Sequence, residues 1–408
     1  MKILVINGDC IQTNSSANLC HLAYLRGLSD AGHEITLISS DGKDYRKDPA
    51  MVLPDGIMYY TYPGMSLYEK LSLKKRRSSI SIPAAGTQGA KAETNRRRAS
   101  FFRRMKIFCL KLYGVHGIYR PFVNKARRFS SKTVFDVVIS LSTPPSSHLL
   151  AYELLKRGRI QAKRWIQIWE DPWYSDAYGF NRKEEIYQEE KRLLGFAEKV
   201  CYVSPITLEN QKALFPESAG KMYWQPLPSY YTSDTLEEDK GCAAPCYGYF
   251  GNYYSAARNL VPFYQAARER GVRAVICGDS NLRLECSEKL RIRKRVPLDE
   301  LRGIEAQTDV LVFLCNSKGG QIPGKIYQYA ASDKTILFIL DGTEEEKKTL
   351  RDFFEPFHRF VFCENRQEDI DAAMERIGGG DLGGVVNRPL TDFDPKRIVA
   401  NILEEGMR

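Results

Sequence analysis

The loop of residues 316–328 has the composition of an anion-binding turn. Gly319 and Gly320 free the backbone to wrap around a ligand, and the N–H groups at the start of the following helix carry a partial positive charge. Lys325 adds a full charge near that helix start, and Gln328 follows three residues later on the same face. Together these groups could hold a diphosphate and a neighbouring hydroxyl. The pattern is not a Walker A loop, because neither Ser nor Thr follows the Gly-Lys pair, and an ordinary βα turn is the alternative.

Two other strand ends in the same half of the chain carry glycine. Gly251 and Asn252 close an expected strand over 247–251, and Arg258 follows seven residues after Gly251. Gly278 closes another expected strand. A strand-end glycine lets a ligand approach the backbone, and an arginine at the start of the next helix can reach a phosphate. The alternative is a pair of ordinary turns with an arginine that faces solvent.

Polar residues also follow two expected strands in the first half. Glu170 and Asp171 end one of these strands, directly before Pro172 and Trp173. Carboxylates at this edge could accept hydrogen bonds from substrate hydroxyls or act as a base, whereas the alternative is a strand-end cap with Pro172 enforcing the turn. The loop after the first strand would face the same edge and contains Asn14, Ser15 and Ser16.

Two sheets must bring these loops together, because apolar runs and amphipathic segments alternate twice along the chain. Strands are expected over 2–7, 34–39, 58–62, 135–141, 164–169, 199–203, 222–225, 247–251, 273–278, 310–315, 335–340 and 360–363. Helices are expected over 17–31, 101–129, 148–156, 183–196, 204–214, 256–270, 298–307, 324–331, 368–377 and 395–405. This alternation predicts the α/β class with parallel sheets.

The length of 408 residues suits two domains. We expect a Rossmann-like N-terminal domain over 1–225, a linker over 226–245 rich in Pro, Ser, Thr and acids, and a Rossmann-like C-terminal domain over 246–394. The sheets should face a central cleft. A terminal helix is expected within 395–408.

Positive charge is concentrated in one insertion, residues 70–132. The whole chain carries a formal charge of +10, whereas this segment holds 18 lysines and arginines against one acid, Glu93, which gives +17 and leaves −7 elsewhere. Within this insertion, the sequence of 101–129 predicts a helix with an apolar stripe flanked by cations. Such a helix either lies on an anionic membrane surface or faces the core with a solvated basic side. A charge this local argues against a nucleic-acid partner.

The remaining composition predicts no metal and no cofactor. Ten cysteines and five histidines show no paired ligand spacing, so we expect reduced core cysteines. No apolar run approaches the ~18 residues of a membrane span, and the first residues do not resemble a signal peptide. We therefore expect a cytoplasmic protein, or one held peripherally on the inner face of the membrane.

Four segments together resemble a known family. IPGKIYQYAASDKTILFIL, at 322–340, resembles the nucleotide-sugar loop of retaining glycosyltransferases with the GT-B fold. FDVVISLSTPPSSHLLAYELL and WIQIWEDPW resemble the first-domain segments of bacterial members that assemble surface polysaccharides or lipid-linked oligosaccharides. YGYFGNYYSAARN, at 247–259, resembles the glycine loop and cation of the same fold. The segments occur in the family's order along nearly the whole chain.

The resemblance implies a transferase that moves a hexose-type sugar from a nucleoside-diphosphate sugar to an acceptor hydroxyl, with retention and without a metal. It also implies that the N-terminal domain lies on the acceptor side, that the C-terminal domain binds the nucleotide sugar, and that the terminal helix packs back on the N-terminal domain. Arg258 and Lys325 would neutralise the leaving diphosphate. Gln328 stands where the family has the Glu that holds the ribose, and Gly320 stands where the first Glu of its paired-Glu motif would fall. Gln321 is a neutral neighbour that could supply part of that role. A lipid-linked saccharide in polysaccharide biosynthesis would be the acceptor.

Two other functions fit the same sequence features. A sugar-nucleotide epimerase can use this architecture, although it would need a pair of acids or a His near the anomeric carbon, and only Glu170 and Asp171 are in place. A degenerate transferase that acts as a partner protein is the other alternative, because the paired Glu is missing. Donor turnover separates it from the enzymes.

Overall fold

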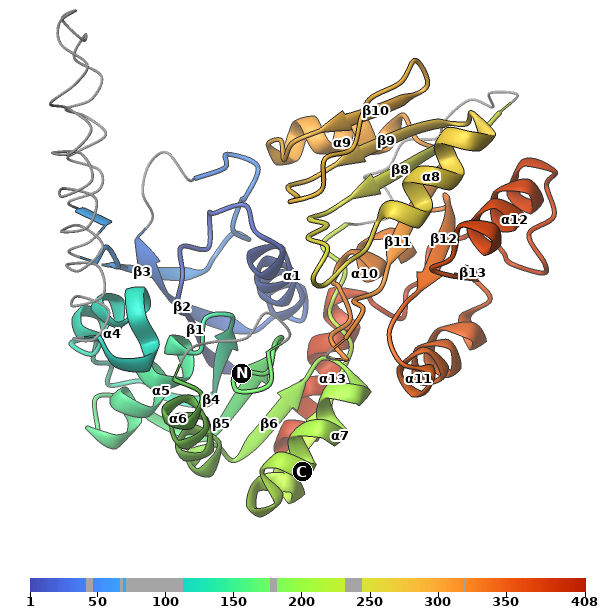
Figure 1. The fold of residues 1–408 in the computed structure, drawn as a ribbon. Helices are drawn as coiled ribbons and strands as arrows, with labels where there is room; N and C mark the ends of the chain where they lie inside the picture. The colour runs from blue at the N-terminus through green and yellow to red at the C-terminus, as the bar shows by residue number, and fades with distance from the viewer. Residues whose placement is uncertain (42–46, 67–68, 71–112, 177–181, 232–243, 319) are drawn as a thin grey trace, which may run out of the picture.

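The computed structural model describes residues 1–41, 47–66, 69–70, 113–176, 182–231, 244–318 and 320–408, and two β-sheets organise this part of the chain (Figure 1). The first sheet has seven strands in the order β3-β2-β1-β4-β5-β6-β7, and the second has six in the order β10-β9-β8-β11-β12-β13. All of these strand pairs are parallel. The predicted α/β class with two parallel sheets is confirmed.

The N-terminal domain consists of the first sheet and the helices around it. Its strands are β1 (Lys2–Asn7), β2 (Glu34–Asp41), β3 (Met58–Pro63), β4 (Val134–Ser142), β5 (Gln161–Trp169), β6 (Lys199–Tyr202) and β7 (Met222–Trp224). Its described helices are α1 (Ser16–Asp30), α4 (Arg120–Ala126), α5 (Ser146–Lys156), α6 (Lys183–Phe196) and α7 (Pro205–Leu214), with 3-10 turns η2 (Gly114–Tyr119) and η3 (Pro216–Lys221). Serine side chains cap α1 and α7, as Ser15 accepts from the Asn18 N–H and Ser204 from the Thr207 N–H.

The C-terminal domain consists of the second sheet and its helices. Its strands are β8 (Cys246–Phe250), β9 (Arg273–Cys277), β10 (Leu290–Arg293), β11 (Val310–Leu314), β12 (Thr335–Leu340) and β13 (Val361–Glu364). Its helices are α8 (Val261–Arg270), α9 (Leu298–Ala306), α10 (Lys325–Ala330), α11 (Glu344–Phe354) and α12 (Gln367–Gly378), with the 3-10 turn η5 (Glu355–Phe357). Every residue of β8 and β11 is buried, as expected for parallel strands covered on both faces.

Both sheets reverse their winding direction at an equivalent place. The reversal lies between β1 and β4 in the first sheet and between β8 and β11 in the second. Ligands of doubly wound sheets bind beyond the carboxyl ends of the strands at such points. Figure 1 shows α1 and α10 in the region where the two domains meet.

The last helix, α13 (Pro395–Met407), returns to the N-terminal domain as predicted (Figure 1). It packs against α1, where a Cβ built at Gly27 would lie only 2.2 Å from the Pro395 carbonyl oxygen. The hydroxyl of Tyr223 on β7 donates to the Ile402 carbonyl over 3.1 Å. The two domains are therefore joined by α13 as well as by the segment after β7.

Several element predictions need correction. The helix expected over 256–270 begins only at Val261, so Arg258 lies in the turn before it. Strand β10 and helix α11 were not predicted, because their short or strongly charged sequences hide the apolar period. Of the helix expected over 101–129, only residues from 113 onward are described, and they form η2 and α4.

Other predictions fall partly outside the described residues. These are most of the basic insertion, residues 232–243 of the linker, and Gly319. The domain boundaries at 225 and 245 stay predictions. Within the residues that the structure describes, no helix combines the length and apolar character needed to cross a bilayer.

Candidate active site

A cavity of about 280 Å³ lies between the two domains, beyond the carboxyl ends of β8 and β9. Residues of both domains line it, which brings together loops more than 200 positions apart in the sequence. The predicted site residues in its wall are Asn14, Ser16, Gly251, Asn252, Arg258, Gly278, Lys325 and Gln328. Ser15, Glu170, Asp171, Gly320 and Gln321 lie outside this lining.

Arg258 is fixed across the winding reversal of the second sheet. Its Nε donates to Asn316 Oδ1 over 2.7 Å, and its Nη1 donates to the Asn252 carbonyl over 3.1 Å. The turn that carries it is also tied to the loop after β11, because the Ser317 N–H donates to the Ala257 carbonyl over 2.8 Å. The bonds to Asn316 and Asn252 use two of the five N–H donors of the guanidinium and set its plane at the cavity wall.

Lys325 also lies in the cavity wall, but its charge is already paired. Its Nζ lies 2.6 Å from Oε1 of Glu305, whose side chain is only 1% exposed. Sequence reasoning missed Glu305, which stands 20 residues earlier in the chain and carries no local signal of this pairing. Helix α10 itself has only six residues, and Lys325 is the first of them.

Gln328 holds the segment that joins the domains. Its Oε1 accepts from the backbone N–H of Tyr230 over 2.5 Å and of Tyr231 over 3.1 Å. The predicted contact between this side chain and a ribose therefore cannot use the amide oxygen while these bonds persist.

Gly278 is needed for packing between two loops of the cavity wall. A Cβ at this position would lie 1.9 Å from the Gly251 carbonyl oxygen. No side chain fits there, so the loop after β9 can lie directly against the loop after β8. A Cβ at Gly251 itself would meet nothing closer than 3.7 Å, and this backbone remains approachable from the cavity side.

Gly320 and Gln321 form a contact between the domains. Gly320 adopts φ +67°, and a Cβ there would lie 2.4 Å from Ile206 Cγ2 on α7. Its carbonyl accepts from Ser204 Oγ over 2.7 Å, and Gln321 Nε2 donates to Asp171 Oδ1 over 2.6 Å. A side chain at position 320 is therefore excluded by the neighbouring domain in this arrangement.

Glu170 belongs to a buried polar network beneath the first sheet's reversal. Its Oε1 lies 3.2 Å from His21 Nε2, and His21 Nδ1 lies 3.0 Å from Asn7 Oδ1. Burial raises the pKa of the Glu170 carboxyl, and His21 opposes this effect. The network joins the ends of β5 and β1 to α1. His21 was missed because its partners come from distant elements.

Asp171 points the other way, toward the second domain. Besides Gln321, its carboxylate accepts from Thr143 Oγ1 over 3.2 Å. Burial, reinforced by the negative charge of Asp176, raises the pKa of the Asp171 carboxyl. The two acids predicted as one pair thus have separate surroundings, and only Asp171 bridges the domains.

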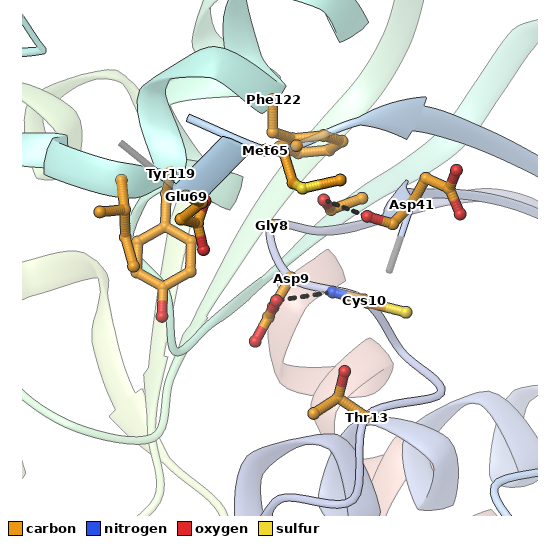
Figure 2. Close-up of a pocket in the computed structure, with 12 residues that line it drawn as sticks. Gly8, Asp9, Cys10, Thr13, Asp41, Met65, Glu69, Tyr119 and Phe122 are labelled. Atoms are coloured by element: carbon orange, nitrogen blue, oxygen red, sulfur yellow. Dashed lines mark hydrogen bonds between the residues drawn. The ribbon is translucent and has the colours of Figure 1, made fainter. Parts of the chain in front are cut away.

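A second, smaller cavity of about 60 Å³ lies inside the N-terminal domain (Figure 2). It is lined by Gly8, Asp9, Cys10, Thr13, Ser40, Asp41, Gly64, Met65, Glu69, Ile118, Tyr119 and Phe122. Figure 2 shows Asp9 turned back on its own loop, where its carboxylate accepts from the Cys10 N–H over 2.8 Å. Thr13 lines this cavity and Asn14 the larger one, so the loop after β1 separates the two.

Solved structures share this architecture, although no protein-family model and no curated protein sequence matches the chain. Sucrose-phosphate synthase from Thermosynechococcus elongatus is similar with a TM-score of 0.60 and 12% identity, over 98% of this chain and 94% of that one. The catalytic domain of starch synthase IV from Arabidopsis thaliana, bound to ADP and acarbose, has a TM-score of 0.60 and 12% identity over 100% and 99%. A glycosyltransferase from Rickettsia africae has 0.52 and 11% over 99% and 98%.

These similarities define the class of this protein by its fold. Two parallel sheets of seven and six strands, with a returning terminal helix, match GT-B glycosyltransferases over essentially the whole chain. The chain therefore has the GT-B fold.

Proposed function

We propose that this protein is a glycosyltransferase that moves a sugar from a nucleoside-diphosphate sugar to an acceptor hydroxyl. The observation that carries the proposal is the cavity between the domains, whose wall holds both Arg258 and Lys325. Two cations beside approachable strand-end backbone suit a diphosphate. The starch synthase IV domain with a similar fold was solved with bound ADP, which supports a nucleotide donor.

The proposed chemistry depends on charge at the leaving group. Negative charge develops on the diphosphate as its bond to the sugar breaks, and fixed cations stabilise that charge without reorganisation. Arg258 is held in place by Asn316 and by the Asn252 carbonyl, so it meets this requirement before the donor arrives. We propose that these side chains serve in place of a metal.

The finer parts of the proposal rest on the sequence. The resemblance of 322–340 to the nucleotide-sugar loop of the family supports transfer of a hexose with retention. The charge of +17 on residues 70–132 supports a peripheral contact with an anionic membrane, and hence a lipid-linked saccharide acceptor in polysaccharide biosynthesis.

A non-catalytic partner protein is the second candidate. Gly320 and Gln328 replace the carboxylates expected from the resemblance, and Lys325 is already paired with Glu305. Such a protein would bind at most a nucleotide and would release no product from a donor. An epimerase would convert the donor sugar without an acceptor.

The test is a thermal-shift screen against UDP, GDP, CDP, dTDP, ADP and their common sugars, without added metal. One nucleotide should raise the melting temperature, and Arg258→Gln should abolish that shift and lower donor turnover by about 100-fold or more, as for other lost charge stabilisers. Arg268→Gln is the matched control, because Arg268 lies on α8 and binds the Tyr264 hydroxyl away from the cavity lining. Full turnover in Arg258→Gln would refute the assigned role, and no shift with any nucleotide would favour the partner protein.

A further inference from the structure

Glu305 lies near the end of α9, behind the cavity wall and outside its lining. Its side chain is 1% exposed, and both carboxylate oxygens have partners. Oε1 lies 2.6 Å from Lys325 Nζ, and Oε2 accepts from the Tyr231 hydroxyl over 2.7 Å. Burying an unpaired carboxylate this deeply would lower the stability of the folded protein, so the pairing with Lys325 is needed to keep Glu305 at this place.

Lys325 reaches the cavity on a flexible stem that needs an anchor. A lysine side chain has four rotatable bonds and a compact charge, so it does not keep one position by itself. Here the ammonium is held between Glu305 and the rings of Tyr231 and Tyr329, at 5.7 Å and 5.6 Å from their centres. The ammonium has three N–H donors, so its bond to Glu305 leaves donors for a ligand in the cavity.

The same carboxylate is connected to the segment between the domains. Tyr231 donates its hydroxyl to Glu305, while its backbone N–H donates to Gln328 Oε1 over 3.1 Å. Burial, together with the nearby Glu305 carboxylate, raises the pKa of the Tyr231 hydroxyl, so the group stays protonated and able to donate. Helices α9 and α10 and the interdomain segment therefore meet at one buried carboxylate.

We propose that Glu305 is a positioning residue, which sets the Lys325 ammonium at the cavity wall for the donor diphosphate and links it through Tyr231 to the segment that joins the domains. This inference rests on the proposed transferase function. Glu305 itself touches no substrate, because Lys325 and Tyr231 stand between it and the cavity.

The test compares Glu305→Gln, Lys325→Met and the double variant. Glu305→Gln should lower kcat by about 10-fold to 100-fold, with a smaller change in the KM for donor, since a misplaced charge affects the transition state most. In the Lys325→Met background, adding Glu305→Gln should change turnover less than about 2-fold, because the two residues act as one unit. A purely structural role would lower turnover by the same factor in both backgrounds.

Stability gives a second readout that is independent of turnover. Lys325→Met leaves a buried carboxylate without its counter-charge, so its melting temperature should fall by about 5 °C or more. The added Glu305→Gln change should recover most of that loss. Glu300→Gln is the matched control, because Glu300 lies on the same helix, is 45% exposed and pairs only with Arg293 among the described residues. It should change neither readout.

The outcomes separate this inference from the function on which it rests. Normal turnover in Lys325→Met would remove Lys325 from the proposed mechanism. A large loss in Lys325→Met with equal, additive losses from Glu305→Gln would overturn the role of Glu305 alone. If Glu305→Gln fails to fold, Glu305→Asp replaces it in the test. The shorter side chain keeps the negative charge but moves it away from the Lys325 ammonium. The resulting loss of turnover should also vanish in the Lys325→Met background.

Discussion

Arg258 and Lys325 reach the same cavity in different ways. The guanidinium of Arg258 is fixed by neutral partners, the Asn316 amide oxygen and the Asn252 carbonyl, so its full charge is available to a ligand. The ammonium of Lys325 is fixed by a buried carboxylate, which offsets part of its charge. Arg258 should therefore contribute more than Lys325 to nucleotide affinity.

At position 320, the structure predicts that no side chain is tolerated. Gly320→Ala would place its Cβ 2.4 Å from Ile206 Cγ2 and would also strain a backbone with φ +67°. We expect a loss of about 1–3 kcal/mol in the free energy of unfolding, measured by denaturant titration. A glutamate there should not restore a family-like site, because it meets the same obstacle.

Two further variants separate the steric contact with Ile206 from the backbone strain at Gly320. Gly195→Ala is the control, since a Cβ there meets no atom within 4 Å, and it should cause no loss of stability. Combining Gly320→Ala with Ile206→Ala should recover the steric part of the loss but not the backbone part. A Gly320→Ala variant as stable as the natural protein would show that the domains separate easily at this contact.

At the scale of elements, α6 holds the loop after Asp171 through one buried carboxylate. Glu190 accepts from the backbone N–H groups of Tyr174 over 2.7 Å and Trp173 over 3.5 Å. Burial raises the pKa of Glu190 from 4.5 to about 7, and the backbone bonds oppose this only in part. The loop that presents Asp171 to the second domain thus depends on a group that titrates in the physiological range.

The sign of the resulting pH dependence follows from that raised pKa. Below pH 4.5 Glu190 is protonated in both the folded and the unfolded chain, so its titration does not change the free energy of unfolding. From pH 4.5 to about 7 the carboxyl ionises in the unfolded chain first, which stabilises the unfolded state and lowers the free energy of unfolding. The natural protein should therefore lose up to about 3 kcal/mol across this window, relative to Glu190→Gln.

The measurement is the melting temperature of both proteins from pH 4 to pH 8. Glu184→Gln, an exposed change on the same helix, should follow the pH profile of the natural protein. Parallel profiles for the natural protein and Glu190→Gln would contradict the raised pKa.

The whole molecule has an uneven charge that the fold alone does not explain. Residues 70–132 carry +17 while the rest of the chain carries −7. Each cation near an anionic bilayer contributes about 1 kcal/mol at most, and salt screens the attraction. We therefore expect the natural protein to bind vesicles that contain anionic lipid and not to bind vesicles of neutral lipid.

Deleting residues 73–98 should weaken that binding and leave donor hydrolysis unchanged. The deletion removes eight lysines and arginines and one acid, so vesicle binding at about 0.1 M salt should fall by at least about 10-fold. Replacing the same eight cations with Gln at constant length is the control for the shortening of the basic insertion, and it should have the same effect. Vesicle binding unchanged in both variants would remove the membrane from the proposed function.

The sequence by itself determined the α/β class, the two parallel sheets and most of the loops that reach the cavity, whereas the return of the terminal helix to the first domain follows only from the family resemblance. These features could be predicted because apolar runs, caps and strand-end glycines are local signals, set by residues a few positions apart. Eight of the predicted site residues line the cavity for the same reason: parallel strands place their following loops at one edge.

Only the tertiary structure decided what each of those side chains contacts. Lys325 pairs with Glu305 from 20 positions away, Gln328 holds Tyr230 from 98, and Gln321 meets Asp171 from 150. The burial of Gly320 against Ile206 and of Glu170 beside His21 likewise joins elements that are distant in sequence. Such contacts depend on how whole domains pack, and no spacing within one segment encodes them.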